Sequence, residues 1–424
     1  MIYHSPPFPL VLDYGPRILK AWTAEDELGL LVASRHLPRV TQILLSAPEL
    51  TLAKLTTSMT KAAPRLDTLV LHSQTSEIVL PKQFLEGSAP QLRHLILTGA
   101  ALSPLQPLLS SATSLVSLVL ERIPSSAYFS PDNLVTLIRT MPLLQILSIG
   151  FLSTVPRPGF RGQRILPLGQ AARIELPSLT QLIYRGVSTY IEALLSRIRL
   201  PRIEDADIAL FNQLTLHVPR TCEFVRELES FRPTRVRIDF ADTSVHVSLS
   251  ASQSTASPPD VFLSVSCARL DFQVAAAAQL CSGLSATLQP RVEELVLGFH
   301  YQDGGALLLP EEWRGEVDPG LWRGLLAPFR CVGTLRVHVA LAAEVERVLR
   351  TGPAEEQPLG EPLLPELREL MLLHGSDESA LKSASATLSV LVDERNDDGR
   401  PVKVSSQDLS RLAEGEAGEP INTY

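Results

Sequence analysis

Cysteine is scarce in this chain of 424 residues, which holds only four, at positions 222, 267, 281 and 331. No two of them form a C-x-x-C pair, so the spacing that marks a zinc ribbon or a thioredoxin-like redox site is absent. Free cysteines are most often buried apolar groups, and we expect the same here. Together with the lack of any N-x-Ser/Thr sequence, this pattern favours a reduced, intracellular chain.

Long apolar runs and a secretory leader are also missing. Hydrophobic residues make up 45% of the chain. No window, however, reaches the roughly 18 uncharged apolar residues that a membrane helix needs. Residues 1–13 contain no Lys or Arg, unlike the start of a secretory signal. The sequence therefore predicts no membrane partner and a location in the cytoplasm or nucleus.

Basic clusters are absent as well. The chain has a net charge of −8, and the segment from Asp303 onward is the more acidic part, with 22 Asp and Glu against 12 Lys and Arg. A nucleic-acid binder needs a basic surface to displace the counterions of the phosphates. We therefore do not expect nucleic acid as a partner.

Catalytic motifs are not found. The chain has no G-x-S-x-G elbow, phosphate loop, H-E-x-x-H pair or G-x-G-x-x-G. Cys281 precedes Ser282 and Gly283 without an identifiable base, so the end of a helix explains it better than a nucleophile. We expect no catalytic residue, metal or cofactor, and a hydrolase or transferase on an α/β scaffold is the less favoured alternative. Histidines in or just after predicted strands are expected at the surface or at a sheet edge, namely His72, His94, His300, His338 and His374.

The chain does contain a recurring line, Pro-x-L-x-x-L-x-L. It occurs at Pro64–Leu71, Pro90–Leu97 and Pro365–Leu372. Weaker copies begin at Val40, Leu115, Leu144, Leu179, Ile203, Val292 and Val332. In the first half the steps between copies range from 23 to 35 residues, too uneven for one uniform repeat. A unit that returns every few tens of residues is typical of a solenoid, and this line is the hydrophobic pattern of a leucine-rich repeat.

The spacing within each copy predicts the secondary structure. The last four positions alternate as a strand does, with the leucines on one face and the intervening residues on the other. Helical patterns lie between the copies, as at 50–63, 131–141 and 189–198, and Ser130 before Pro131 is a good N-cap. We therefore predict an α/β fold, an irregular leucine-rich-repeat solenoid in which a curved parallel sheet is backed by helices.

Changes in this pattern divide the chain into five parts. Strand-like alternation at 235–240, 244–249 and 261–265 interrupts the repeats, either as an insertion or as strands of the solenoid joined by hairpins. The predicted parts are a capping strand (9–14) and helix (from Thr23) in 1–37; repeat units in 38–228; a β-rich insertion with a Ser- and Pro-rich loop in 229–273; further repeat units in 274–404, opening with a helix at 274–288; and a disordered acidic tail in 405–424.

The face of the sheet opposite the leucines is the best candidate for function. Several of its positions are apolar, which on an exposed face would mark a partner-binding surface. The alternative is that both faces are covered, because parallel strands often carry apolar residues on both. Asp205 and Asp207 share a face and could hold a cation or an arginine, or form a plain solvated surface. The candidate partner-binding residues are Leu44, Thr68, Val70, His94, Ile96, Ser117, Val119, Gln181, Ile183, Asp205 and Asp207.

The order of segments resembles a family of F-box and leucine-rich-repeat-like proteins from mushroom-forming fungi (basidiomycetes). Apart from the repeat lines, the segments that carry the resemblance are Pro9–Tyr14, Pro124–Phe129, Gly186–Leu195, Phe211–Thr215, Val218–Pro219, Leu270–Val274, Leu363–Leu367 and Gly399–Val402. The resemblance implies a non-catalytic module that recognises a protein substrate for a ubiquitin ligase.

Members of this family often carry an F-box ahead of the segment equivalent to Pro9, and the F-box binds the adaptor of a cullin-based ligase. Only eight residues precede Pro9 here, and they contain no F-box. We therefore expect the adaptor as a partner only if an F-box is missing from this sequence; otherwise the copy has lost it, and a non-functional family copy is a further alternative.

Overall fold

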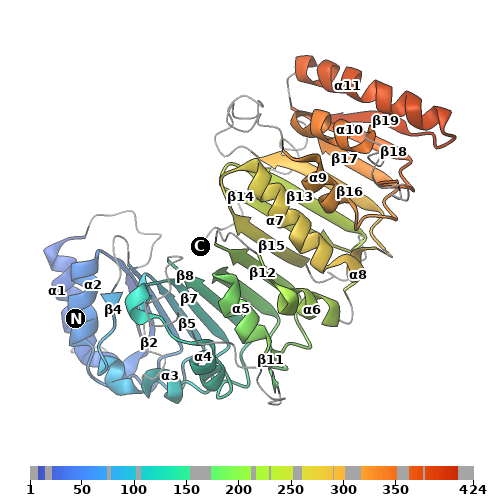
Figure 1. Ribbon diagram of the computed structural model, residues 1–424. Coiled ribbons are helices and arrows are strands. Elements are labelled where there is room, and N and C mark those ends of the chain that lie inside the picture. Colours follow the sequence, from blue (N-terminus) through green and yellow to red (C-terminus); the bar gives the residue numbers. More distant parts are fainter. Residues whose placement is uncertain are drawn as a thin grey trace. The chain divides into compact units, whose positions relative to one another are not determined.

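The computed structural model describes residues 8–14, 22–73, 78–101, 107–152, 173–211, 216–228, 231–251, 260–289, 291–300, 317–350, 362–375 and 378–408. The chain divides into two compact units, unit 1 (Met1–Ile208) and unit 2 (Ala209–Tyr424). Each unit consists of a mainly parallel, curved sheet with helices between its strands (Figure 1), which confirms the predicted leucine-rich-repeat fold.

In unit 1 the strands follow one another across the sheet in chain order. They are β1 (Leu10–Tyr14), β2 (Val40–Ala47), β3 (Thr68–Ser73), β5 (His94–Thr98), β7 (Ser117–Ile123), β8 (Ile146–Phe151), β10 (Gln181–Gly186) and β12 (Asp205–Leu210). Neighbours from β1 to β10 pair in parallel. β3 begins two residues after Leu66, and β5 two residues after Leu92, as the repeat line predicts. Two short parallel pairs lie beside this sheet, β4 (Ile78–Val79) with β6 (Ala100–Ala101), and β9 (Ile174–Glu175) with β11 (Ile198–Arg199).

The connections of unit 1 contain short helices. They are α1 (Ala24–Ala33), η2 (Ser34–Arg39), α2 (Glu49–Ser58), η3 (Phe84–Gly87), α3 (Pro107–Ser111), η4 (Ser125–Ala127), α4 (Pro131–Ile138) and α5 (Ser188–Leu195). Thr23 caps α1 in a capping box with Asp26, and Ser130 caps α4 ahead of Pro131, so both predicted helix starts are confirmed. α2 ends before the predicted residue 63 because Met59 leaves the helical conformation, with φ −83° and ψ 65°.

The leucines of the repeat line form the core. Leu69, Leu71, Leu95 and Leu97 are completely buried, while the residues between them in β3 and β5 are half-buried. Each buried leucine contributes about 2 kcal/mol relative to an exposed one, so the sum over the repeats holds sheet and helices together. The predicted irregularity appears between β7 and β8, where the register shifts between Leu120 and Ile123.

In unit 2 the strand order departs from the chain order. It runs β15 (Asp260–Ser266), β14 (Ser244–Ser250), β13 (Arg235–Ala241), β16 (Glu294–His300), β17 (Thr334–His338), β18 (Glu369–His374) and β19 (Lys403–Asp408). β14 pairs antiparallel with both β13 and β15, whereas β13 pairs in parallel with β16. The predicted β-rich segment is therefore part of the sheet, joined by hairpins, and not a separate insertion. Residues 252–259 of its predicted Ser- and Pro-rich loop lie outside the described residues.

The helices of unit 2 are α6 (Pro219–Glu227), α7 (Leu270–Gly283), α8 (Ser285–Leu288), α9 (Pro319–Leu326), η6 (Val339–Leu341), α10 (Ala342–Arg350) and α11 (Glu378–Asp397). Successive helices α9, α10 and α11 contact one another, and α7 contacts α9 and the sheet strands β13 and β14 (Figure 1). Trp322 of α9 is completely buried against Phe240 of β13, with ring centroids 5.6 Å apart.

Two of the predicted boundaries are wrong. The division at 273/274 cuts α7, which already begins at the buried Leu270. The disordered tail cannot begin at 405, because β19 extends to Asp408 in parallel register with β18. β19 is mostly polar and lacks the leucines of the repeat line, which is why the pattern did not predict it. Residues 409–424 lie outside the described part of the chain, and the boundaries at 37/38 and 228/229 stay predictions.

No helix in the described ranges combines the length and the apolar character needed to span a bilayer.

Candidate functional site

One face of the unit 1 sheet carries an aligned row of apolar side chains. Leu44, Val70, Ile96 and Val119, here called the apolar row, lie opposite one another on β2, β3, β5 and β7. Strands in a sheet are about 4.8 Å apart, so the four positions span roughly 14 Å. The register continues through Ser148 on β8 to Ile183 on β10.

The apolar row is half-buried at each of its four positions, as is Ile183. Ser148, which lies between Val119 and Ile183 in this register, is only 1% exposed, so the accessible apolar surface is interrupted there. The leucines on the other face of the same strands are fully buried. The apolar row is therefore partly accessible to solvent, in contrast to the helix-covered face.

Polar residues flank the apolar row on both sides. On one side lie Gln42, Thr68, His94, Ser117, Ile146 and Gln181 in mutual register, with Ile146 the one apolar member. Thr68, His94 and Gln181 are half-buried, as the candidate assignment requires. Ser117, in register between His94 and Ile146, is only 5% exposed, so it is the least accessible of the candidates on this flank.

The other flank was missed by the sequence analysis. Ser46, His72, Thr98 and Glu121 follow the apolar row by two residues and are again in register. The sequence could have predicted this flank, because the residue directly after the last leucine of each strand again lies on the face opposite the leucines. Burial, helped by the charge of Arg122, lowers the pKa of His72. Burial also raises the pKa of Glu121, against the opposing effects of Arg185 and of a hydrogen bond from Ser148.

Asp205 and Asp207 lie on the same face of β12, as predicted, and both are half-buried. The side-chain amide of Gln181 donates a hydrogen bond to Asp205 at 2.8 Å between Nε2 and Oδ2. Across the described ranges, no three His, Cys, Asp or Glu side chains are grouped so that they could hold a metal ion. The two aspartates thus belong to the polar continuation of the face.

The corresponding face of unit 2 is charged. Glu294 accepts a hydrogen bond from Arg235 at 2.8 Å and forms an ion pair with Arg336 at 2.5 Å, which ties β13, β16 and β17 together. Arg237 pairs with Asp239 at 2.6 Å on β13 itself. Each of these charged side chains is therefore in an ion pair. The face of the unit 2 sheet is a network of ion pairs, whereas the face of the unit 1 sheet carries apolar side chains.

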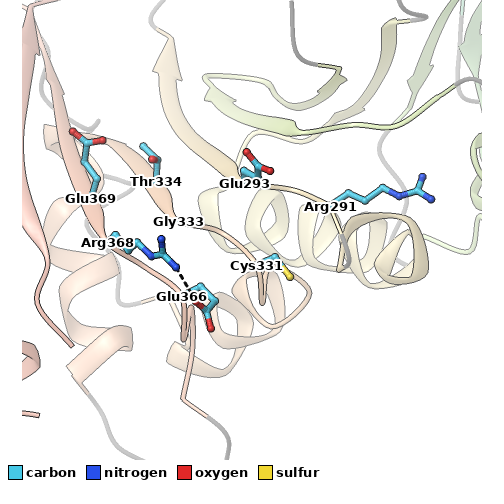
Figure 2. A pocket seen from close by; sticks show the side chains of 8 residues that line it. All are labelled: Arg291, Glu293, Cys331, Gly333, Thr334, Glu366, Arg368 and Glu369. Carbon is cyan, nitrogen blue, oxygen red and sulfur yellow. Dashed lines mark hydrogen bonds and ion pairs between the residues drawn. The ribbon is translucent and has the colours of Figure 1, made fainter. Parts of the chain in front are cut away.

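A pocket of about 570 Å³ opens where β16, β17 and β18 begin, and Figure 2 shows its lining. Its charged groups have mixed signs, and Arg368 pairs with Glu366 at 3.5 Å. Cys331 is exposed in this pocket, which corrects the expectation that every cysteine is buried. The lining residues include no histidine that could serve as a base for the thiol.

The remaining cysteines are buried, as predicted. Cys281 lies near the end of α7, where burial raises the pKa of its thiol to about 12. The bounds of α7 confirm the predicted helix end at Cys281, and a thiol with this pKa stays protonated at neutral pH.

His338 is not at the surface, contrary to expectation. It is 1% exposed, and its Nδ1 accepts a hydrogen bond from the backbone N–H of Ala340 at 3.3 Å, so it caps η6. His72, His94 and His374 are half-buried.

Comparison with known proteins gives little further information. No protein-family model and no curated protein sequence matches the chain. Among solved structures, a match is the leucine-rich repeat-containing protein LegL7 from Legionella pneumophila, with 11% sequence identity, a TM-score of 0.30, and coverage of 90% of this chain and 97% of that one. This TM-score is too low to establish a shared fold. The assignment as leucine-rich repeats therefore rests on the repeat line and on the sheets that it forms.

Proposed function

We propose that this chain is a non-catalytic protein-interaction module that binds its partner on the unit 1 sheet face. The observation that carries the proposal is the apolar row, Leu44, Val70, Ile96 and Val119, which is half-buried and flanked by polar residues on both sides. An apolar patch with a polar rim is the composition of a protein interface.

The geometry of the row favours a particular kind of partner segment. A row of roughly 14 Å corresponds to about nine residues of an α-helix, which rises 1.5 Å per residue. An amphipathic helix presents one such apolar line, with polar residues on either side of it. The partner proposed here is a protein that places such a helix along the apolar row.

The finer part of the proposal follows the family resemblance. The bound protein would be a substrate awaiting ubiquitination, and a cullin-ligase adaptor would join only through an F-box. Buried free thiols suit the reducing environment of the cytoplasm or nucleus, where such a receptor would act.

The test is a photo-crosslinking pull-down from the native organism. A photoreactive amino acid at Val70 should capture the partner, whereas the same residue at Leu50 should not, because Leu50 of α2 is 75% exposed but lies outside the sheet face. The triple variant Val70→Asp, Ile96→Asp and Val119→Asp should lose the captured protein, while Leu50→Asp retains it. Circular dichroism checks that each variant is folded.

The outcomes separate the alternatives. Loss of the partner in the triple variant, with the ligase adaptor also recovered, supports a receptor role; loss without the adaptor supports a free-standing interaction module. Capture from Leu50 as strongly as from Val70, or no partner from any version, would contradict the proposal and favour a non-functional copy.

A further inference from the structure

A separate hollow of about 320 Å³ in unit 2 is lined by arginine. Arg226 near the end of α6, Arg232 after it, and Arg291 ahead of β16 all line it. All three residues are exposed. No Asp or Glu is found among the described residues that line the hollow.

These arginines differ from those of the unit 2 sheet in having no carboxylate partner. Arg235, Arg237 and Arg336 form ion pairs. Arg226 only donates from Nε to the backbone carbonyl of Cys222 at 3.4 Å, and within the described ranges none of the three lining arginines is in an ion pair. Figure 2 shows that the guanidinium of Arg291 points away from the Arg368–Glu366 pair of the neighbouring pocket. The hollow therefore gathers positive charge that the described chain does not neutralise.

Two helix ends explain only part of this charge. α6 and α8 both end beside the hollow, and a helix end carries at most the equivalent of about half a negative charge. These partial charges do not neutralise three guanidinium groups, so the hollow favours an anion.

Apolar residues form part of the lining, here called the floor of the hollow. Val225, Leu228 and Phe231 line it and are 1%, 8% and 3% exposed. Thr287 adds a hydroxyl to the lining, which can donate a hydrogen bond to an anion. A ligand of matching chemistry has an anionic group for the arginines and an apolar substituent for the floor.

We propose that this hollow binds a small phosphate monoester that carries an apolar substituent. A phosphate monoester has close to two negative charges at neutral pH and three acceptor oxygens, which suits a hollow lined by three arginines. A carboxylate has one charge and a planar pair of oxygens, which a single arginine satisfies. The volume lies at the lower end of the range for small-molecule pockets, which fits a ligand of this size.

The test is isothermal titration calorimetry of the full chain with phenyl phosphate. Inorganic phosphate and phenol are the comparison ligands. Phenyl phosphate should bind saturably at one site and more tightly than inorganic phosphate, by roughly threefold, because only phenyl phosphate contacts the apolar floor. Phenol should show no saturable binding. Equal affinity for phenyl phosphate and inorganic phosphate would overturn the assignment of the floor, and no saturable binding of phenyl phosphate would overturn the site.

Arginine variants locate the site. Arg226→Gln, Arg232→Gln and Arg291→Gln should each weaken phenyl phosphate binding by about tenfold, the typical loss for a charge-assisted hydrogen bond. The matched control is Arg368→Gln, which removes an exposed arginine from the neighbouring pocket and should leave the affinity unchanged. Unchanged affinity in all three variants, or an equal loss in Arg368→Gln, would overturn the proposal. All four positions are exposed, so folding should be preserved, and circular dichroism verifies this.

Discussion

The guanidinium of Arg395 donates a hydrogen bond to the backbone carbonyl of Leu364 at 3.3 Å, and a second one to that of Leu363 at 2.9 Å. Arg395 belongs to α11 and is 7% exposed, while Leu364 has a φ of 47°, a backbone conformation that side chains rarely adopt. The buried arginine thus fixes the turn before β18 to the long helix that follows that strand.

Replacing this arginine should destabilise unit 2. Arg395→Met keeps much of the volume but leaves two carbonyls without their donor, at a cost of about 2 kcal/mol or more. Chemical denaturation measures the loss. Arg400→Met is the control, because the Arg400 side chain is 41% exposed and its pair with Asp398 should contribute less than about 1 kcal/mol. Equal stability of the two variants would contradict the role of Arg395.

Two glycines should respond in opposite ways to alanine. At Gly186 a Cβ would clash with the hydroxyl of Tyr184 and lie 3.0 Å from Phe151, so Gly186→Ala should cost about 1 to 3 kcal/mol. It would also disturb the hydrogen bond from the Tyr184 hydroxyl to the Val187 carbonyl, which is 2.9 Å long. At Gly29 in α1 a Cβ meets nothing within 4 Å, so Gly29→Ala should stabilise by about 0.5 to 1 kcal/mol. Thermal denaturation compares the pair, and the same sign for both would refute this explanation.

His72 should make unit 1 less stable in acid. Its pKa is lowered from 6.5 in the folded chain, so the unfolded chain binds the proton more readily. The contribution of His72 is therefore present above pH 6.5 and is lost as the pH falls through the folded pKa. Urea denaturation between about pH 5 and 8 should show a smaller pH dependence for His72→Gln than for the wild type. An identical profile would show that His72 does not contribute.

Glu121 should change the pH dependence of stability in the direction opposite to that of His72. Its pKa is raised from 4.5, so its contribution to stability is present below pH 4.5 and is lost as the pH rises through the folded pKa. Glu121→Gln should consequently stabilise unit 1 at neutral pH. The neighbouring Arg185 supplies the check, because loss of stability in Glu121→Gln would mean that attraction to Arg185 outweighs the cost of burial.

The four thiols should differ in their reactivity with a disulfide reagent. Cys331 is exposed and should react quickly, whereas Cys222, Cys267 and Cys281 are buried and should react only on unfolding. Burial also raises the pKa of Cys267 to about 11. Spectroscopic counting at neutral pH should find one fast thiol in the folded chain and none in Cys331→Ser. More than one fast thiol would show that a buried cysteine becomes accessible.

The fold was predictable wherever the leucine spacing is regular. The buried leucines on either side of Val70 and Ile96 follow from alternation alone, as do the half-buried residues between them. β19 was missed because its strand is mostly polar and is held by pairing with β18, a contact that local sequence does not encode.

The candidate site was only partly predictable, for the same reason. The register of the apolar row follows from the repeat, but the burial of Ser117, at 5% exposed, depends on packing that the repeat pattern does not specify. Arg226 and Arg291 are 65 residues apart in the sequence, so their common hollow depends on packing.

The reversed strand order in unit 2 has a consequence for how the chain folds during synthesis. β13 and β14 are joined by a tight hairpin, in which Ala241 pairs with Ser244, so this pair can form as soon as it leaves the ribosome. The parallel partner of β13 arrives much later, because Arg235 pairs with Glu294. One edge of the early hairpin must therefore stay unpaired while about 50 further residues are made, and an unpaired strand edge invites aggregation. The interval before β16 emerges is the stage at which a nascent chain of this protein most needs a chaperone.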